Sequence, residues 1–178
     1  VRAKQSPRLM LFAPPRHGKS EIVSRRFPAY ALGRYPDMSF IATSYASDLS
    51  NRNNRDVQRI IDEDTYRHIF PNTNLNGKNV RTVSQSTFLR NSDIFEIVDH
   101  KGVYRSAGVG GGITGMGGDV LIVDDPIKDF EQAESQVYRD KVFDWFKSTL
   151  YTRASSGGGI LIILTRWHHD DLAGRLIE

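Results

Sequence analysis

LMLFAPPRHGKSEIV, the stretch from Leu9 to Val23, carries the strongest structural signal in this chain. It runs from an apolar segment through a turn that holds Gly18, Lys19 and Ser20, and continues with helical spacing. Glycine lets backbone N–H groups approach an anion, lysine reaches the outer oxygens of a phosphate, and serine can ligate Mg²⁺. The stretch therefore predicts a phosphate-binding loop between a strand and a helix.

The loop departs from the pattern G-x-x-x-x-G-K-[ST] at its first position, where Ala13 replaces glycine. A simpler interpretation is also open, because Gly18 or Ser20 could cap an ordinary helix without binding any ligand. The context supplied by the rest of the chain has to separate these two interpretations.

Composition describes a chain of ordinary globular character. The chain has 178 residues, which is enough for one domain with a sizeable core, and its formal net charge of +3 permits an anionic partner without requiring one. It contains no cysteine, so disulfides and thiolate chemistry are excluded. No apolar run approaches the ~18 residues of a membrane span. We therefore expect no membrane partner.

Strand and helix patterns alternate along the chain. Strands are predicted over 8–13, 38–45, 119–126 and 158–167, and helices over 19–36, 46–64 and 131–154, with Pro28 interrupting the first helix and Ser47 or Asp48 capping the second. Residues 93–112 alternate around a turn and predict a β-hairpin, whereas 71–87 predict a surface excursion. The alternation predicts an α/β domain with a mainly parallel sheet, flanking helices and an inserted β-hairpin.

Two carboxylates follow the third predicted strand. Val120 to Val123 are apolar and deliver Asp124 and Asp125 to the carboxyl end of that strand, where open α/β sheets bind ligands. In P-loop nucleotidases one such carboxylate holds Mg²⁺ and a neighbour can orient the attacking water. The alternative is an Asp-Asp-Pro turn with no ligand. Because the loop that ends at Ser20 also predicts phosphate binding, the two motifs together favour a nucleotide site over a turn without a ligand.

The chain resembles the ATPase motor domain of a tailed-phage terminase large subunit, the enzyme that packages viral DNA. The resemblance is carried by APPRHGKS as a Walker A loop, by GGGITGMGGDVLIVDDP leading into Walker B, and by ILTRWHHDDLAGRL as a coupling segment at a strand end. It extends from Arg8 to Leu176.

The resemblance implies a P-loop NTPase of the additional-strand type that uses ATP and Mg²⁺. It also implies a homo-oligomeric ring on the procapsid portal protein, a small terminase subunit as partner, and double-stranded DNA as the track, all in the bacterial host cytoplasm. Residues 1–178 would form an N-terminal ATPase domain that is truncated before a further core strand. The nuclease domain of the family would lie beyond Glu178, so this chain would not carry nuclease activity.

The expected site residues follow from these motifs. Lys19 would contact the β and γ phosphates, Ser20 and Asp124 would hold Mg²⁺, and Asp125, one methylene shorter than the glutamate of many terminases, would be the catalytic base. Arg16 would be both catalytic and nucleotide-binding, acting on its own γ-phosphate. The expected nucleotide-binding set is Arg16, His17, Gly18, Lys19, Ser20 and Thr165.

Several polar residues have simpler interpretations. Arg16 could be an exposed arginine without a contact, and Thr165 could make only a strand-end hydrogen bond. The segment WHHDD, 167–171, lacks metal-ligand spacing and predicts a helix start. Arginines on the first two helices predict solvated faces, so the sequence names no DNA-binding residue.

Two other functions stay open at this point. The first is a helicase-type or other P-loop NTPase acting on a different substrate, and the second is a kinase-like phosphoryl transferase. A helicase would need a second motor domain, and a kinase would need an acceptor pocket and a lid. Neither is visible in the sequence, and the chain beyond Glu178 would discriminate among them.

Overall fold

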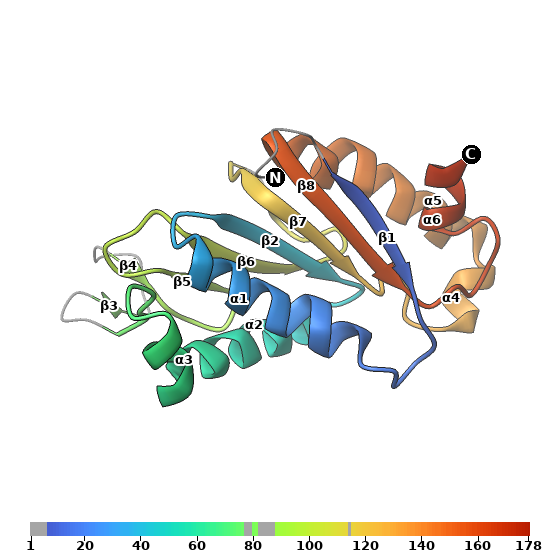
Figure 1. Ribbon diagram of the computed structural model, residues 1–178. Helices are drawn as coiled ribbons and strands as arrows, with labels where there is room; N and C mark the ends of the chain where they lie inside the picture. The colour runs from blue at the N-terminus through green and yellow to red at the C-terminus, as the bar shows by residue number, and fades with distance from the viewer. Residues whose placement is uncertain (1–6, 77–79, 82–87, 114) are drawn as a thin grey trace.

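The computed structural model describes residues 7–76, 80–81, 88–113 and 115–178. Their main feature is a six-stranded sheet with the order β1-β8-β7-β2-β6-β5, seen in Figure 1. Its members are β1 (Arg8–Phe12), β8 (Ala154–Leu164), β7 (Gly118–Asp124), β2 (Ser39–Ser44), β6 (Val103–Gly108) and β5 (Ile94–Glu96). Each strand runs parallel to its neighbour except β5, which is antiparallel to β6. The predicted α/β class is confirmed.

One strand lies between the strand that precedes the predicted phosphate loop and the strand that ends at the two aspartates. β8 pairs with β1 on one side and with β7 on the other, which is the additional-strand arrangement. The parallel pairing brings the carboxyl ends of β1, β8 and β7 to one edge of the sheet. β1 is itself an outer strand, and the further strand expected after Glu178 stays a prediction.

The predicted β-hairpin is present as β5 and β6. Ile97 N–H donates to the Gly102 carbonyl at 2.9 Å, and Asp99 turns the chain with a φ of 62°. β6 also pairs in parallel with β2, so one arm of the hairpin belongs to the main sheet. The sequence analysis did not assign that role because the partner strand lies about sixty residues earlier in the chain.

The predicted surface excursion contains a second, two-stranded sheet. β3 (Val80–Arg81) pairs in parallel with β4 (Phe88–Leu89), whereas 77–79 and 82–87 lie outside the described residues. The start of the excursion is not a surface segment, since Thr73 and Leu75 are each 1% exposed. Buried contacts therefore attach this segment to the domain.

The helix after the phosphate loop contains a wide turn before its proline. A π-helical segment, η1 (Glu21–Arg26), leads into α1 (Phe27–Arg34), and Phe27 N–H donates to the Ile22 carbonyl. Pro28 has no N–H to donate to the Ser24 carbonyl, which instead accepts from the Tyr104 hydroxyl at 3.3 Å. The predicted interruption at Pro28 is therefore a π turn within a continuous helix.

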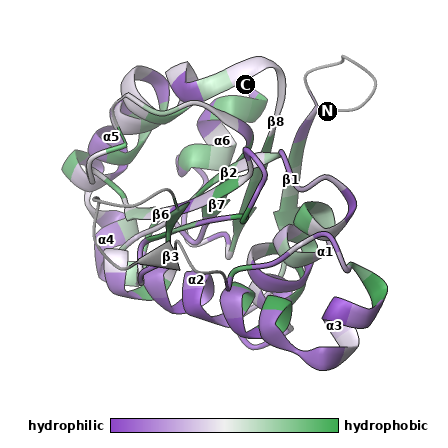
Figure 2. Cartoon of the chain, turned by 90° about the vertical axis from the view of Figure 1, so that its left-hand side faces the viewer, coloured by the Kyte–Doolittle hydropathy of each residue, from purple (hydrophilic) through white to green (hydrophobic). Residues whose placement is uncertain are grey.

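The second helix is α2 (Ser47–Asp62), which is followed by α3 (Asp64–Ile69). Its N-cap is Ala46 and no side chain caps it, so the prediction that Ser47 or Asp48 would do so was wrong. Figure 2 shows α2 as a mostly hydrophilic helix. Even its buried face is partly polar, because it carries Ser50, Asn53, Asn54 and Gln58.

The predicted helix over 131–154 is not continuous. It consists of α4 (Phe130–Glu134), α5 (Gln136–Trp145), a π-helical segment η2 (Phe146–Leu150) and a 3-10 turn η3 (Tyr151–Arg153). Ser135 separates α4 from α5, because its hydroxyl accepts from Tyr138 N–H at 3.4 Å and caps α5. The last helix is α6 (Leu172–Ile177).

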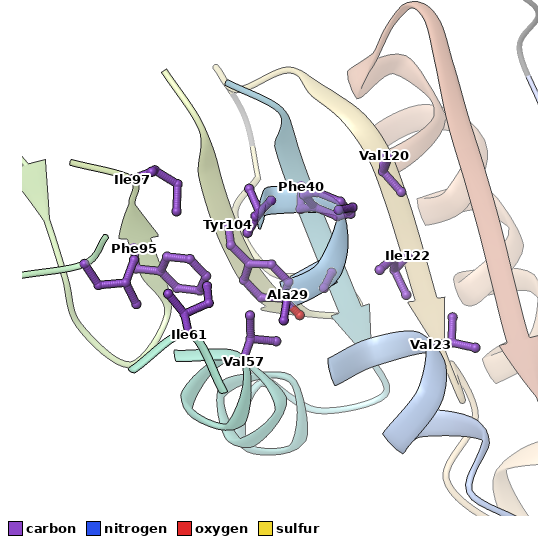
Figure 3. Packing of buried hydrophobic residues seen from close by; sticks show 14 of the residues in the cluster. Val23, Ala29, Phe40, Val57, Ile61, Phe95, Ile97, Tyr104, Val120 and Ile122 are labelled. Atoms are coloured by element: carbon purple, nitrogen blue, oxygen red, sulfur yellow. The ribbon is translucent and has the colours of Figure 1, made fainter. Parts of the chain in front are cut away.

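The helices cover both faces of the sheet and form two hydrophobic cores. The first core lies between the sheet and η1, α1, α2 and α3, and Figure 3 shows its labelled side chains converging from several of these elements. The second core lies between the sheet and α4, α5, η2 and α6. Among the described residues, no helix combines the length and apolarity that crossing a bilayer requires.

Candidate functional site

A cleft of about 380 Å³ opens at the carboxyl edge of the sheet. It lies where the predicted phosphate loop and the carboxyl ends of β7 and β8 meet. Its lining residues are Pro15, Arg16, Gly18, Lys19, Ser20, Glu21, Arg25, Tyr45, Asp125, Lys128, Thr165 and Trp167.

The loop between β1 and η1 adopts left-handed backbone at two positions. Gly18 has a φ of 77°, which glycine adopts without strain, and Arg16 has a φ of 64°, which is costly for a residue with a Cβ. Arg16 is exposed and lines the cleft. The His17 ring instead turns to its own loop, with Nδ1 2.9 Å from the Pro15 carbonyl oxygen, and it does not line the cleft.

Lys19 is held by groups from two other strand ends. Its Nζ forms an ion pair with Asp125 Oδ2 at 2.8 Å and donates to Thr165 Oγ1 at 2.7 Å. Thr165 N–H donates to Asp125 Oδ1 at 2.9 Å, so the three residues form a closed set of contacts. The Asp125 backbone is also left-handed, with a φ of 46°. Strained backbone of this kind persists where surrounding contacts hold it, as they do here.

Asp124 occupies a different environment from its neighbour. It is 1% exposed, and its Oδ1 accepts from the Ser20 hydroxyl at 3.0 Å. Its Oδ2 accepts from the Ser24 hydroxyl at 2.7 Å and from Asn53 Nδ2 at 3.3 Å. Burial raises the pKa of the Asp124 carboxyl, because desolvation outweighs the hydrogen bonds from Ser24 and Ser20 that favour its charged form.

The pair formed by Ser20 and Asp124 fits a magnesium ion. Mg²⁺ prefers hard oxygen ligands and is usually bound by one or two protein groups together with phosphates and waters. A serine hydroxyl oxygen and a carboxylate oxygen 3.0 Å apart beside the cleft supply that donor set. The described residues contain no cluster of three or more His, Cys, Asp or Glu side chains that could hold a metal.

Arg25 lines the cleft and was not among the predicted site residues. Its Nε donates to Asn53 Oδ1 at 3.0 Å, and its guanidinium also pairs with Glu21 at 3.0 Å and with Asp56 at 3.3 Å. Sequence reasoning missed Ser24, Asn53 and Arg25 as neighbours of the site. Ser24 follows Ser20 by four residues and Arg25 follows Glu21 by four, so both had a local sequence signal, whereas Asn53 had none.

The segment after β8 forms a turn that is stabilised by side-chain contacts. Arg166 Nε pairs with Asp171 Oδ2 at 2.7 Å, and Asp171 Oδ1 accepts from Gly174 N–H at 2.9 Å to cap α6. A Cβ on Gly174 would lie 1.9 Å from the His169 carbonyl oxygen, so glycine is required there. The predicted helix start in WHHDD is confirmed.

The same turn is tied to α5. The Asp170 carboxylate accepts from Arg139 at 2.9 Å and from Arg175 at 2.6 Å. These two guanidinium groups hold the pKa of Asp170 well below its usual range, with Arg175 contributing most. The segment that carries Thr165 into the cleft is thus anchored to the helical layer behind it.

Comparisons with known proteins give one family match and several similar solved structures. A family model described as terminase large subunit, T4likevirus-type, N-terminal, matches residues 10–176. No curated protein matches the chain. The crystal structure of the HK97 bacteriophage large terminase is similar with a TM-score of 0.59 at 11% identity, covering 97% of this chain and 32% of that one. At this identity the likeness shows the fold, and the chain spans about a third of the HK97 protein.

Two further solved structures are more distant. The large terminase of a thermophilic bacteriophage gives a TM-score of 0.49 at 13% identity, with 92% of this chain and 34% of that chain covered. A mutant ATPase domain of the Thermus phage P74-26 large terminase gives 0.42 at 16% identity, with 92% and 60% covered. The family model itself extends over nearly the whole chain. The chain therefore belongs to the family of T4likevirus-type terminase large subunit N-terminal domains.

Proposed function

We propose that this domain hydrolyses ATP with Mg²⁺ and so drives the translocation of double-stranded viral DNA into a procapsid. The observation that carries the proposal is the set of contacts among Lys19, Asp125 and Thr165 at the cleft, beside the pair of Ser20 and Asp124. A cation, a candidate base and a candidate metal-binding pair thus lie together at one edge of the sheet. This is the arrangement that phosphoryl transfer needs.

In this proposal the phosphate loop binds the nucleotide. Lys19 exchanges Asp125 for the β and γ phosphates, because a doubly charged phosphate competes well for an ammonium group. Gly18 and the backbone N–H groups around it surround the phosphates, and His17 contributes through its backbone rather than its ring. Thr165 keeps its backbone bond to Asp125 and contacts the γ-phosphate through its hydroxyl.

Ser20 and Asp124 would hold the magnesium ion. When bound, the ion supplies positive charge that neutralises the phosphate oxygens during transfer. The contribution of this chain is a buried carboxylate whose second oxygen is already occupied by Ser24 and Asn53.

Asp125 would orient and deprotonate the attacking water. Once Lys19 has turned to phosphate, Asp125 Oδ2 is free, while Oδ1 stays fixed by Thr165 N–H. Water then attacks the γ-phosphorus, the bond to the ADP oxygen breaks, and Asp125 accepts the proton. The left-handed Asp125 backbone presents the shorter side chain to the cleft.

We also propose how the longer protein is organised and assembled. Residues 1–178 would be the N-terminal ATPase domain of a longer protein whose nuclease domain follows. The longer protein would work as a homo-oligomeric ring with the portal protein and a small terminase subunit, in the host cytoplasm at the procapsid. A helicase-type P-loop NTPase with another substrate is the alternative.

A packaging assay separates these functions. Full-length protein, procapsids and linear double-stranded DNA are mixed with ATP and Mg²⁺, and the DNA protected from added nuclease is measured. We expect protection that requires ATP. Strand separation of a labelled duplex without any protected DNA would instead support the helicase-type alternative.

Arg16 provides a second prediction. Its side chain is exposed and lines its own cleft, from which it can reach the γ-phosphate of the same subunit. An arginine that stabilises phosphoryl transfer contributes ~10³ to 10⁵ in rate, so Arg16→Ala should reduce ATP turnover by about 10³-fold. The matched control is Arg34→Ala, which removes an exposed arginine from the end of α1, away from the cleft. Its turnover should equal that of the wild type.

A mixing experiment shows whether Arg16 acts within its own subunit. Arg16→Ala and Asp125→Asn subunits are combined in full-length, assembled motors, and ATP turnover is measured. If Arg16 acts within its subunit, every site is defective and turnover stays near the sum of the two parents. Substantial recovery would mean that Asp125→Asn subunits lend Arg16 to intact neighbouring sites.

A further inference from the structure

Two buried side chains hold the oxygen of Asp124 that faces away from Ser20. We infer that Ser24 and Asn53 are positioning residues that fix the Asp124 carboxylate, so that its Oδ1 alone is presented to the metal. This inference rests on the proposed function, since it assigns Asp124 to Mg²⁺. Ser24 lies on η1 and Asn53 on α2, and neither was among the predicted site residues.

The contacts divide the carboxylate into two halves. Oδ2 accepts from the Ser24 hydroxyl at 2.7 Å and from Asn53 Nδ2 at 3.3 Å, whereas Oδ1 lies 3.0 Å from the Ser20 hydroxyl. Ser24 is 0% exposed and Asn53 is 2% exposed, so water does not compete for either bond. A carboxylate held in this way cannot rotate to exchange its oxygens without breaking both bonds.

Arg25 fixes the orientation of the Asn53 amide. The Arg25 guanidinium is a donor and never an acceptor of hydrogen bonds. The ionised Asp124 carboxylate is an acceptor and never a donor. Asn53 therefore has to turn Oδ1 toward Arg25 Nε, at 3.0 Å, and Nδ2 toward Asp124. Arg25 is itself held by Glu21 and Asp56, so the chain of contacts from the cleft wall to the metal-binding carboxylate has one stable arrangement.

The neighbouring asparagine shows that burial alone does not explain this contact. Asn54 is also buried, on the same helix, yet its Nδ2 donates to Ser106 Oγ at 3.3 Å and its Oδ1 accepts from Gln58 at 2.7 Å. The bond to Ser106 joins α2 to β6, whereas the bond from Gln58 lies within α2. Asn53 thus contacts the Asp124 carboxylate, whereas Asn54 makes contacts that stabilise the fold.

Groups behind a metal ligand typically change metal affinity 10- to 100-fold when they are removed. In Asn53→Ala, Asp124 Oδ2 keeps only the Ser24 bond, and the carboxylate is less fixed and less stabilised in its charged form. We therefore expect the Mg²⁺ concentration that half-saturates binding of a fluorescent ATP analogue to rise by about 10-fold or more. Analogue binding without Mg²⁺ should stay unchanged.

The experiment compares full-length wild-type protein with Asn53→Ala and Asn54→Ala at a fixed analogue concentration, with Mg²⁺ and then Mn²⁺ titrated. Circular dichroism and thermal melting report the fold of each variant. Asn54→Ala should lower the melting temperature and leave the metal dependence at the wild-type value. Equal shifts in metal dependence for the two variants would overturn the inference.

A second pair of variants decides the matter if Asn53→Ala does not fold. Ser24→Ala removes the shorter bond to Asp124, and Ser50→Ala is its control, because the Ser50 hydroxyl donates only to helix carbonyls. Ser24→Ala should raise the half-saturating Mg²⁺ concentration and Ser50→Ala should not. A wild-type protein that binds the analogue without any metal dependence would contradict the proposed function instead, so the two failures are distinct.

Discussion

Lys19→Ala is expected to abolish measurable ATP turnover while the protein stays folded. The Lys19 ammonium is the cation that the structure holds between two strand ends, through Asp125 and Thr165. Its removal leaves the phosphates without that charge, and loss of one preorganised donor of this kind costs at least about 10²-fold in rate. Asp125 keeps its bond from Thr165 N–H and is 25% exposed, so water can solvate the carboxylate that loses its partner.

Steady-state phosphate release by full-length protein measures this effect. The matched control is Lys141→Ala, which removes an exposed lysine from α5, away from the cleft. Turnover in the control should equal that of the wild type. If Lys19→Ala retained wild-type turnover, the P-loop assignment would be wrong.

Asp125→Asn is expected to bind Mg²⁺-ATP and to hydrolyse it about 10² to 10⁴-fold more slowly, the range that general-base catalysis contributes. Amide and carboxylate are nearly isosteric, and the asparagine Oδ1 can still accept from Thr165 N–H. What is lost is the charge that pairs with Lys19 and the ability to accept a proton from water.

Asp124→Asn should behave differently, because Asp124 is the buried carboxylate beside Ser20. We expect its main effect on the Mg²⁺ dependence of nucleotide binding rather than on the rate at saturating Mg²⁺. The two variants are compared by titrating Mg²⁺ in both binding and turnover assays. Identical titrations for Asp124→Asn and Asp125→Asn would refute the division of roles.

The sequence was sufficient to predict that the motif residues at the strand ends lie close together. Gly18, Lys19 and Ser20 follow one apolar strand, and Asp124 and Asp125 follow another, so parallel pairing alone predicts that they meet. The structure brings these groups together with Thr165 in contacts of 2.7 to 3.0 Å. Local patterning, strand direction and ligand chemistry all point to the same edge of the sheet.

The residues behind the site could not be predicted in this way. Asn53 and Asn54 are identical and adjacent in the sequence, and only the rotation of α2 against β7 decides which one reaches Asp124. A buried polar residue on a mostly hydrophilic helix has no periodic signal of its own. At the wide π turn before Pro28, the Ser24 carbonyl likewise accepts a hydrogen bond from Tyr104, on a strand about eighty residues later.

Two features of the helices and strands were not predicted from the sequence, for related reasons. The apolar period continues across Ser135, which concealed the break between α4 and α5 that its hydroxyl creates as a cap. The hairpin signal of β5 and β6 was local and correct, but the parallel pairing of β6 with β2 is a long-range contact. Local periodicity predicts that a strand exists and does not name its distant partner.

In the proposed function the cleft binds the phosphates of ATP through Lys19 and holds Mg²⁺ through Ser20 and Asp124. A crystal structure of the protein with Mg²⁺ and a slowly hydrolysed ATP analogue would show both contacts. We expect that Lys19 Nζ leaves Asp125 Oδ2, now 2.8 Å away, and contacts the β and γ phosphates, with the metal on Ser20 and Asp124 Oδ1. A nucleotide bound elsewhere, with the ion pair of Lys19 and Asp125 intact, would contradict the proposed function.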